Sequence, residues 1–447
     1  MRFFITKNSD YVIPADAYAL TLFPKHRSSI FSSLNDIWRR INSEEMQPIY
    51  EDLFILGLSV FAIDKRMSRK ISSDNWTRDI SIHIPVSDCD LWFPLSYKIE
   101  SMLSFLSGDH WSVSFYESSE RYALSPIRRD KHIDVSSYDS VCLFSGGLDS
   151  FCGAIKLASE GHSMCLLGHN EYPKLRAKQE RMATTIATEF HQQQIRFFDF
   201  TANARAPVNV DERLQFVENT SRSRSLLFLC AAISIAGIIG ENTPVYIPEN
   251  GFISINVPLT QSRSGSCSTR TTHPFFLESF RGLLSDLGLC HEIINPYQFM
   301  TKRQVVESAI ESQAFHSEYM NTISCSHPCN PRWKKMPYPK NCGYCYPCII
   351  RKVALMDIEN GNNGYSPLPF SSYQDLLSFD NDSGNDLKAI CASVHRYINA
   401  DELEIKRLVL STGRLSADTL EQHLAVYRNT MSDLATYLRN AFGYEED

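Results

Sequence analysis

The chain has 447 residues, which is enough for two or three domains with a sizeable core. Its hydrophobic content of 43% and charged content of 21% are typical of a globular protein, and the net charge of −7 argues against a large basic face for nucleic acid. No apolar run reaches the length of a membrane span, and the segment Met1–Lys7 is too short and polar for a secretory signal. We therefore expect a cytoplasmic protein without a membrane partner.

Residues 1–137 have the pattern of a separate α+β accessory domain. Its expected elements are three strands and one helix: 53–63, 80–84 and 112–116 for the strands, and 95–106 for the helix. The charges of Asp64, Arg66 and Arg78 are more typical of a solvated surface than of a functional site. A role of this region in partner contact or substrate positioning stays open.

Residues 138–365 alternate between strand and helix patterns, which predicts an α/β fold with a doubly wound parallel sheet. The expected strands are 141–144, 163–168, 195–200 and 244–248. The expected helices are 151–161, 174–190, 223–239, 275–287 and 302–310. Residues 366–447 are predicted to form a helical region. Because ligands bind at the carboxyl ends of parallel strands, one crevice is expected, formed by residues 145–150, 169–171, Asp199 and 249–251.

A glycine-rich turn joins the first of these strands to the helix that follows. It reads Ser145-Gly146-Gly147-Leu148-Asp149-Ser150. Its glycines let the backbone approach an anion, its serine hydroxyls can donate to phosphate oxygens, and the helix N-terminus adds positive charge. Asp149 is suited to hold magnesium. The lysine of a Walker loop is missing, which favours binding of pyrophosphate as a leaving group over γ-phosphoryl transfer.

A group of cysteines near residue 340 predicts a metal site. The chain has 13 cysteines, an odd number, and nothing indicates export, so a disulfide framework is not expected. The predicted ligands of a structural zinc ion are Cys325, Cys342, Cys345 and Cys348. Cys329 and His327 are rivals for the place of Cys325, and an iron–sulfur cluster is the chemical alternative.

These motifs carry a resemblance to known enzymes. The Ser-Gly-Gly-x-Asp-Ser turn resembles the signature of the PP-loop ATP pyrophosphatases, whose members adenylate a substrate oxygen. Within this family the chain is similar, over about 138–360, to QueC, 7-cyano-7-deazaguanine synthase. The matching stretches are Arg224-Ser-Leu-Leu-Phe-Leu, Thr301-Lys302, Ser324-Cys325 and Cys342-Gly-Tyr-Cys-Tyr-Pro-Cys-Ile-Ile-Arg351. The added N-terminal region, the helical tail and the longer spacing between Cys325 and Cys342 resemble the QatC family, the QueC-like proteins of the Qat anti-phage defence operons.

The resemblance implies a PP-loop fold that uses ATP, Mg²⁺ and Zn²⁺. It implies that the carboxylate of a 7-deazaguanine is adenylated, and that the acyl group then passes to ammonia or to an amine of a protein partner from the same operon. The residues expected to act in catalysis are Asp149, Ser150 and Lys302, and those expected to bind substrate are Arg224, Glu249, Asn250, Arg263 and Arg351. Arg263 lies in a polar loop that is also compatible with a flexible insertion without a role.

Two other functions stay open. A tRNA- or nucleobase-modifying PP-loop enzyme is favoured by the basic stretch 332–340 and disfavoured by the overall acidity, so nucleic acid remains uncertain as a partner. A non-catalytic nucleotide sensor of a defence complex is the other alternative. The intact Asp149 and both serines of the turn argue against it.

Overall fold

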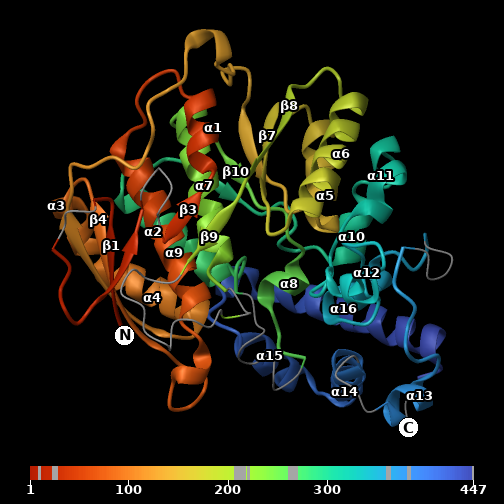
Figure 1. The fold of residues 1–447 in the computed structure, drawn as a ribbon. Coiled ribbons are helices and arrows are strands. Elements are labelled where there is room, and N and C mark those ends of the chain that lie inside the picture. The colour runs from red at the N-terminus through yellow and green to blue at the C-terminus, as the bar shows by residue number, and fades with distance from the viewer. Residues whose placement is uncertain are drawn as a thin grey trace.

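The computed structural model describes most of the chain, as Figure 1 shows. The described residues are 1–8, 12–22, 29–205, 218, 222–259, 270–358, 364–379 and 384–444. None of the helices in these ranges combines the length and the apolar character that crossing a bilayer requires.

A five-stranded parallel sheet forms the centre of the molecule. Its strands are β6 (Ser140–Leu143), β7 (Met164–His169), β8 (Ile195–Phe200), β10 (Val245–Tyr246) and β11 (Ile293–Ile294). They lie in the order β11-β10-β6-β7-β8, and every pair is parallel. After β6 the chain forms β7 and β8 on one side of this strand, and it then forms β10 and β11 on the other side. The strand order therefore reverses between β6 and β10. A crevice forms at such a point outside the carboxyl ends of the strands.

Helices cover both faces of this sheet. Side chains of consecutive strand residues point to opposite faces, so apolar residues in succession need a packing partner on each face. Val141 and Leu143 share a core with α7, whereas Cys142 and Phe144 share another with α5 and α6. Figure 1 shows α7 on one side of the sheet and α5 and α6 on the other. The helices of this region are α5 (Leu148–Ser159), α6 (Pro173–Glu189), α7 (Arg224–Ile239), α8 (Gly251–Ile255), α9 (Pro274–Asp286), α10 (Lys302–Glu307), α11 (Gln313–Glu318) and α12 (Tyr346–Ala354). The structure confirms an α/β arrangement with a parallel sheet.

The N-terminal region contains a second sheet, of order β2-β1-β4-β5, whose strands are also all parallel. Among the described residues, three strands come first, and helices then lie between the third, fourth and fifth strands, so the region combines helices with a parallel sheet. Its elements are β1 (Arg2–Thr6), β2 (Tyr18–Thr21), β3 (Ile30–Ser32), α1 (Leu34–Ile41), α2 (Pro48–Arg66), β4 (Asp79–Val86), α3 (Cys89–Trp92), α4 (Ser96–Ser107) and β5 (His110–Glu117). The short strand β9 (Ala202–Ala204) of the central region pairs antiparallel with β3.

The apolar run 53–63 is part of the helix α2, so its prediction as a strand is wrong. The helix begins with Pro48 in its first turn and ends with Lys65 and Arg66 in its last turn, which suits the helix dipole. Apolar residues occur all around it, because it is buried between the N-terminal sheet and α7. A helix buried on all sides lacks the one-sided periodicity that separates helix from strand in a sequence.

One hydrophobic core extends across residue 137. Leu53 and Leu58 of α2 belong to the same cluster as Leu226 of α7 and Val141 of β6. The close approach of α2 to α7 needs a small residue, because a Cβ atom at Gly57 would lie 3.0 Å from the Cys230 sulfur. The N-terminal region and the central sheet are therefore packed together through shared apolar side chains.

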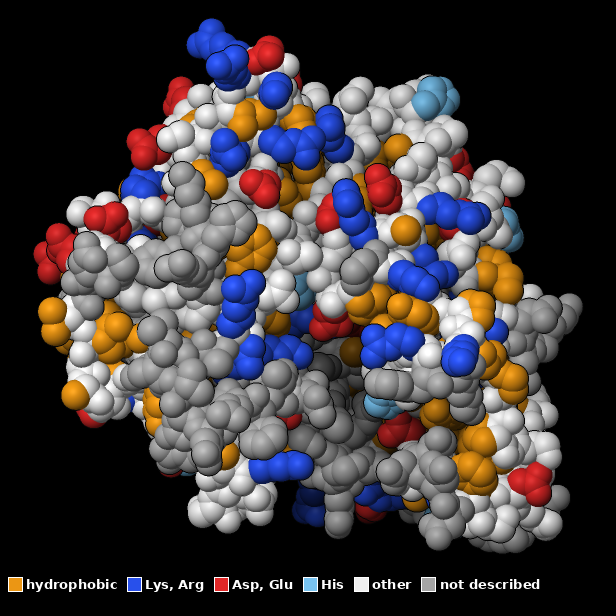
Figure 2. All heavy atoms as spheres, in the orientation of Figure 1, with side chains coloured by type: hydrophobic (Ala, Val, Ile, Leu, Met, Phe, Trp, Pro, Cys, Tyr) orange, Lys and Arg blue, Asp and Glu red, His pale blue; other side chains and the backbone are white. Residues whose placement is uncertain are grey.

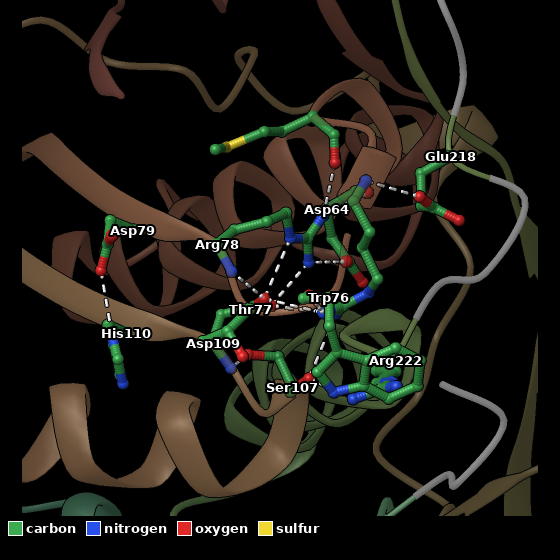
Figure 3. A network of polar contacts seen from close by, with 12 residues as sticks. Asp64, Trp76, Thr77, Arg78, Asp79, Ser107, Asp109, His110, Glu218 and Arg222 are labelled. Carbon is green, nitrogen blue, oxygen red and sulfur yellow. Dashed lines mark hydrogen bonds and ion pairs between the residues drawn. The ribbon is translucent and has the colours of Figure 1, made fainter. Parts of the chain in front are cut away.

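A buried ionic network joins the same two regions, as Figure 3 shows. The Arg78 guanidinium donates to Asp64 at 2.7 Å and to Asp109 at 2.6 Å, and none of these three side chains is exposed to solvent. Burial alone would lower the pKa of Arg78, but the two carboxylates outweigh burial and raise it. Asp64 also accepts from the backbone N–H and hydroxyl of Ser223, the residue before α7. Asp64 and Arg78 thus fix the start of α7, and their prediction as solvated surface charges is wrong.

The C-terminal residues form the predicted helical region. Its helices are α13 (Tyr373–Ser378), α14 (Asn385–Asn399), α15 (Glu402–Leu410) and α16 (Ala417–Phe442). They enclose a second hydrophobic core, in which Leu424 and Tyr427 of α16 lie with Phe252 of α8 and Ile349 of α12. This core anchors the residues that follow β10 and the helix that carries the last predicted cysteine ligand.

Candidate active site and metal centre

The glycine-rich turn forms a tight loop at the carboxyl end of β6. Gly146 has φ +83°, a left-handed conformation that favours glycine, and Gly147 is the N-cap of α5. The hydroxyls of Ser145 and Ser150 lie 3.1 Å apart. The Ser150 hydroxyl also donates to the Gly147 carbonyl at 3.1 Å. The turn therefore presents two hydroxyls and the N-terminus of a twelve-residue helix at one place.

Asp149 is the centre of the polar contacts beside this turn. Its carboxylate accepts from Lys302 Nζ at 2.5 Å, from Asn250 Nδ2 at 2.7 Å and from the Asn250 backbone N–H at 3.3 Å. Burial alone would raise the pKa of Asp149, but Lys302 and hydrogen bonds from neighbouring side chains outweigh burial and lower it. The structure thus brings together three predicted site residues from α5, from the loop after β10 and from the start of α10.

Lys302 reaches this position because α10 begins at the predicted N-cap. The Thr301 hydroxyl accepts from the Gln304 backbone N–H at 3.3 Å, and Gln304 Oε1 accepts from the Thr301 backbone N–H at 2.8 Å. This reciprocal pair is a capping box. The capping box fixes Lys302 as the first residue of the helix, and Lys302 is buried.

Glu249 adds a second carboxylate next to Asp149. Burial and the negative charge of Asp149 raise the pKa of Glu249, and a side-chain hydrogen bond joins the two groups. Asn295, after β11, holds this segment by donating to the Glu249 carbonyl at 2.9 Å. Two adjacent carboxylates that repel one another provide the oxygen donors and the charge that Mg²⁺ prefers. Asp149 and Glu249 therefore place two carboxyl groups next to one another beside the turn.

A second group of polar side chains follows β7 and β8. Arg224, at the start of α7, forms a 2.6 Å ion pair with Glu171, and these side chains are 47% and 39% exposed. Asn170 Nδ2 donates to Asp199 at 2.5 Å. Electrostatic contact of Arg224 with Glu171 and Glu249 connects this group to the first one. Figure 2 shows a hollow near the middle of the face, over α8, with basic and acidic side chains along its upper edge.

The four predicted zinc ligands lie together. The sulfur atoms of Cys325, Cys342, Cys345 and Cys348 all lie within 4.8 Å of one another, and two of the sulfur pairs are 3.9 Å apart. Tetrahedral zinc with bonds of about 2.3 Å would hold its sulfurs about 3.8 Å apart. Backbone N–H groups point to Cys325 Sγ at 3.3 and 3.4 Å and to Cys342 Sγ at 3.3 Å, which suits thiolates. The cluster fits zinc, and neither rival ligand, Cys329 or His327, belongs to it.

The metal cluster and the glycine-rich turn are directly connected. The Ile323 backbone N–H, two residues before Cys325, donates to the Gly146 carbonyl at 2.9 Å. Arg351 supports the same segment: it is 1% exposed, contacts the Thr322 hydroxyl and donates to the Tyr319 carbonyl at 2.9 Å. These contacts hold the segment before Cys325, and substrate binding by Arg351 stays a prediction. Arg263, another of the five predicted substrate ligands, lies outside the described residues.

Two residues that position the site carry no signal in the linear sequence. Gln179 of α6 is fully buried and donates from Nε2 to the Phe144 carbonyl at 2.9 Å. A Cβ atom at Gly146 would lie 2.9 Å from Gln179 Cγ, so the turn and α6 are in close contact. Asn295 is the second such residue. Both act through contacts between distant parts of the chain, which a linear pattern does not reveal.

Comparisons with known proteins do not assign the chain to a family. No family model matches it, and no curated protein matches it. The site is therefore defined by its own residues: a glycine-rich turn at the reversal point of a parallel sheet, a buried Asp149–Lys302 pair and a four-cysteine cluster behind the turn.

Proposed function

We propose that the chain is an ATP-dependent, AMP-forming enzyme that activates the carboxylate of 7-carboxy-7-deazaguanine and passes the acyl group to an amine. The observation that carries this proposal is the arrangement of Asp149, Lys302 and Asn250 around the turn 145–150 at the reversal point of the sheet. The substrate class rests on the sequence resemblance to the QueC-like proteins.

The turn supports the choice of leaving group. It offers two hydroxyls and a helix N-terminus to a phosphate chain, and it contains no lysine of its own. Lys302 reaches in from α10 and lies beside Asp149, where positive charge can stabilise the negative charge that develops during displacement at the α-phosphorus. Asp149 and Glu249 would hold a magnesium ion, which supplies charge neutralisation to pyrophosphate oxygens.

The reaction is balanced without an oxidant or reductant. A carboxylate oxygen attacks the α-phosphorus of ATP, the bond to the bridging oxygen breaks, and an acyl-adenylate and pyrophosphate form. An amine then attacks the acyl carbon, the bond to AMP breaks, and an amide and a proton result. The amine is ammonia or a group on a partner protein of the same defence operon. Zinc at the four cysteines would have a structural role, because four thiolates leave no open position.

The test is to incubate the purified protein with ATP, magnesium, 7-carboxy-7-deazaguanine and ammonia and to separate the nucleotides by chromatography. AMP and pyrophosphate should form only when the deazaguanine is present. Asp149→Asn should lower the rate about 100-fold or more. Asp139→Asn is the matched control: Asp139 is half-exposed and precedes β6, at the opposite end of that strand, so its rate should stay unchanged. Formation of ADP, or AMP formation that is insensitive to Asp149→Asn, would contradict the proposal.

A further inference from the structure

His169, at the end of β7, is a buried polar group that the proposed chemistry does not use. Its side chain is 7% exposed, and within the described residues neither ring nitrogen has a hydrogen-bond partner. Aromatic rings surround it: Phe61 at 5.9 Å, Phe200 at 5.0 Å and Phe228 at 6.4 Å between centroids. Buried polar atoms without partners are costly and rare, so a partner from outside the described chain is expected.

Helices α2 and α7 each contribute one aromatic and one cationic side chain near His169. On α2, Phe61 is followed one turn later by Lys65, and on α7, Arg224 is followed one turn later by Phe228. Residues four apart lie on the same face of a helix, and α2 packs along α7. The aromatic members contact His169 and the cationic members lie toward solvent. We call the aromatic side chains Phe61 and Phe228 around His169 the floor, and the charged side chains Lys65, Arg224 and Glu171 the rim.

The rim carries an excess of positive charge. Arg224 is paired with Glu171 at 2.6 Å, whereas the Lys65 ammonium has no hydrogen-bond or ion-pair partner among the described residues. Burial, followed by Arg224, lowers the pKa of His169 to about 4, and the charge of Lys65 adds to this effect, so the imidazole is neutral at pH 7. Arg224, more than burial or Lys65, sets the lowered pKa of Glu171. Lys65 and Arg224 face Glu171, and the pKa of Glu249, the other acidic group in electrostatic contact with Arg224, is raised by burial, so its negative charge is disfavoured. The rim is therefore suited to an anionic group.

This group lies next to the glycine-rich turn. Leu143 of β6 pairs with Leu167 of β7, and the Phe144 N–H donates to the Leu167 carbonyl at 2.7 Å. His169 follows two residues later, and neighbouring strands lie about 4.8 Å apart. The start of the turn and the floor at His169 are thus side by side at the same edge of the sheet.

We propose that α2 of the N-terminal region completes a substrate subsite for a planar heteroaromatic acid, in which Lys65 and Arg224 bind the acidic group and Phe228 contacts the ring. This inference rests on the proposed function, because 7-carboxy-7-deazaguanine belongs to this class of ligand. It gives residues 1–137 a direct part in substrate selection. The sequence resemblance does not supply this part, because it covers only about 138–360.

The test is calorimetric titration of the full-length protein with 7-carboxy-7-deazaguanine in the absence of ATP. Lys65→Met should weaken binding about tenfold or more, because it removes a charge-assisted contact. Lys65→Arg should restore binding. ATP binding, titrated separately, should stay unchanged in all variants. Lys70→Met is the matched control, because Lys70 is an exposed lysine beyond the end of α2, and it should have no effect.

A ligand without the acidic group separates contact from structure. For 7-deazaguanine itself, wild type and Lys65→Met should bind equally, since the group that Lys65 contacts is missing. If Lys65→Met weakened the binding of both ligands equally, a contact between Lys65 and the acidic group would be overturned. The same conclusion would follow if the wild-type protein bound neither ligand. Binding of the acid without AMP formation would leave the subsite standing and reject the proposed reaction. If AMP formed and Lys65→Met bound the acid as tightly as wild type, the subsite would be rejected and the proposed reaction would stand.

Discussion

Asp149 and Lys302 form a buried ion pair, and the two side chains are only 7% and 9% exposed. Removing one member of such a pair leaves an uncompensated charge, whereas removing both is far less costly. We expect Lys302→Met to lower the free energy of unfolding by about 3 kcal/mol or more. The double variant Asp149→Asn/Lys302→Met should recover most of this loss and still form no AMP. Chemical denaturation of the four proteins measures the coupling, and additive losses would contradict a direct interaction.

At the scale of single residues, the sequence predicted the groups that belong to contiguous motifs. The turn 145–150 and the four cysteines lie in short segments whose residue types already indicate their chemistry. Asp64 and Arg78 were wrongly placed at the surface, because each stands next to other charged residues, a pattern that is typical of a solvated surface. Only the fold brings them together with Asp109, which stands 31 residues after Arg78.

Among the elements, α9 depends on a neutral histidine. His273 is fully buried, its Nδ1 accepts from the Phe275 N–H at 3.2 Å, and its Nε2 lies 3.2 Å from the Thr412 hydroxyl. Burial, followed by Arg270, lowers its pKa to about 3. The unfolded chain would bind a proton near pH 6.5, so His273 stabilises the fold fully above that pH and loses this contribution as the pH falls toward 3.

The expected result is a melting temperature that falls as the pH is lowered from 7 to 5. Each such histidine contributes about 1.4 kcal/mol per pH unit below 6.5. His169 and His423, whose pKa values burial lowers to about 4, act in the same direction. His273→Asn should reduce the slope, because asparagine can cap the helix without titrating. The same substitution at the exposed His110 is the control and should leave the slope of melting temperature against pH unchanged. An unchanged slope for His273→Asn would contradict the account.

The segment that carries the cysteines should depend on its metal. Metal analysis of the purified protein should find about one zinc ion per chain, and the protein should lack the visible absorption of an iron–sulfur cluster. Cys348→Ala should lose the zinc, whereas Cys329→Ala should keep it, because only Cys348 belongs to the cluster. Zinc retention by Cys348→Ala would show that another residue completes the ligand set.

At the scale of the whole molecule, the N-terminal region and the central sheet share a core and the network around Arg78. Residues 138–447 alone would expose the face of α7 that packs on α2 and would leave Ser223 without Asp64. We therefore expect this fragment to be insoluble or unfolded, and the full chain to unfold these two regions in a single calorimetric transition. A stable, monomeric fragment would show that the shared core is dispensable.

The α/β character of residues 138–365 could be predicted because each strand and helix carries its own local pattern. The long C-terminal helix α16 has a regular apolar spacing and was predicted within a helical region for the same reason. The buried helix α2, the parallel N-terminal sheet and the position of Lys65 near His169 could not be predicted. Each depends on which surfaces meet in the folded chain.

The central claim is that a carboxylate oxygen attacks the α-phosphorus of ATP, and oxygen transfer tests it most directly. 7-Carboxy-7-deazaguanine labelled with ¹⁸O in its carboxylate should be incubated with the protein, ATP, magnesium and ammonia, and the AMP analysed by mass spectrometry. The account predicts that AMP gains one ¹⁸O atom from the carboxylate. AMP without label, formed in unlabelled water, would mean that water attacks instead and would contradict adenylation of the deazaguanine.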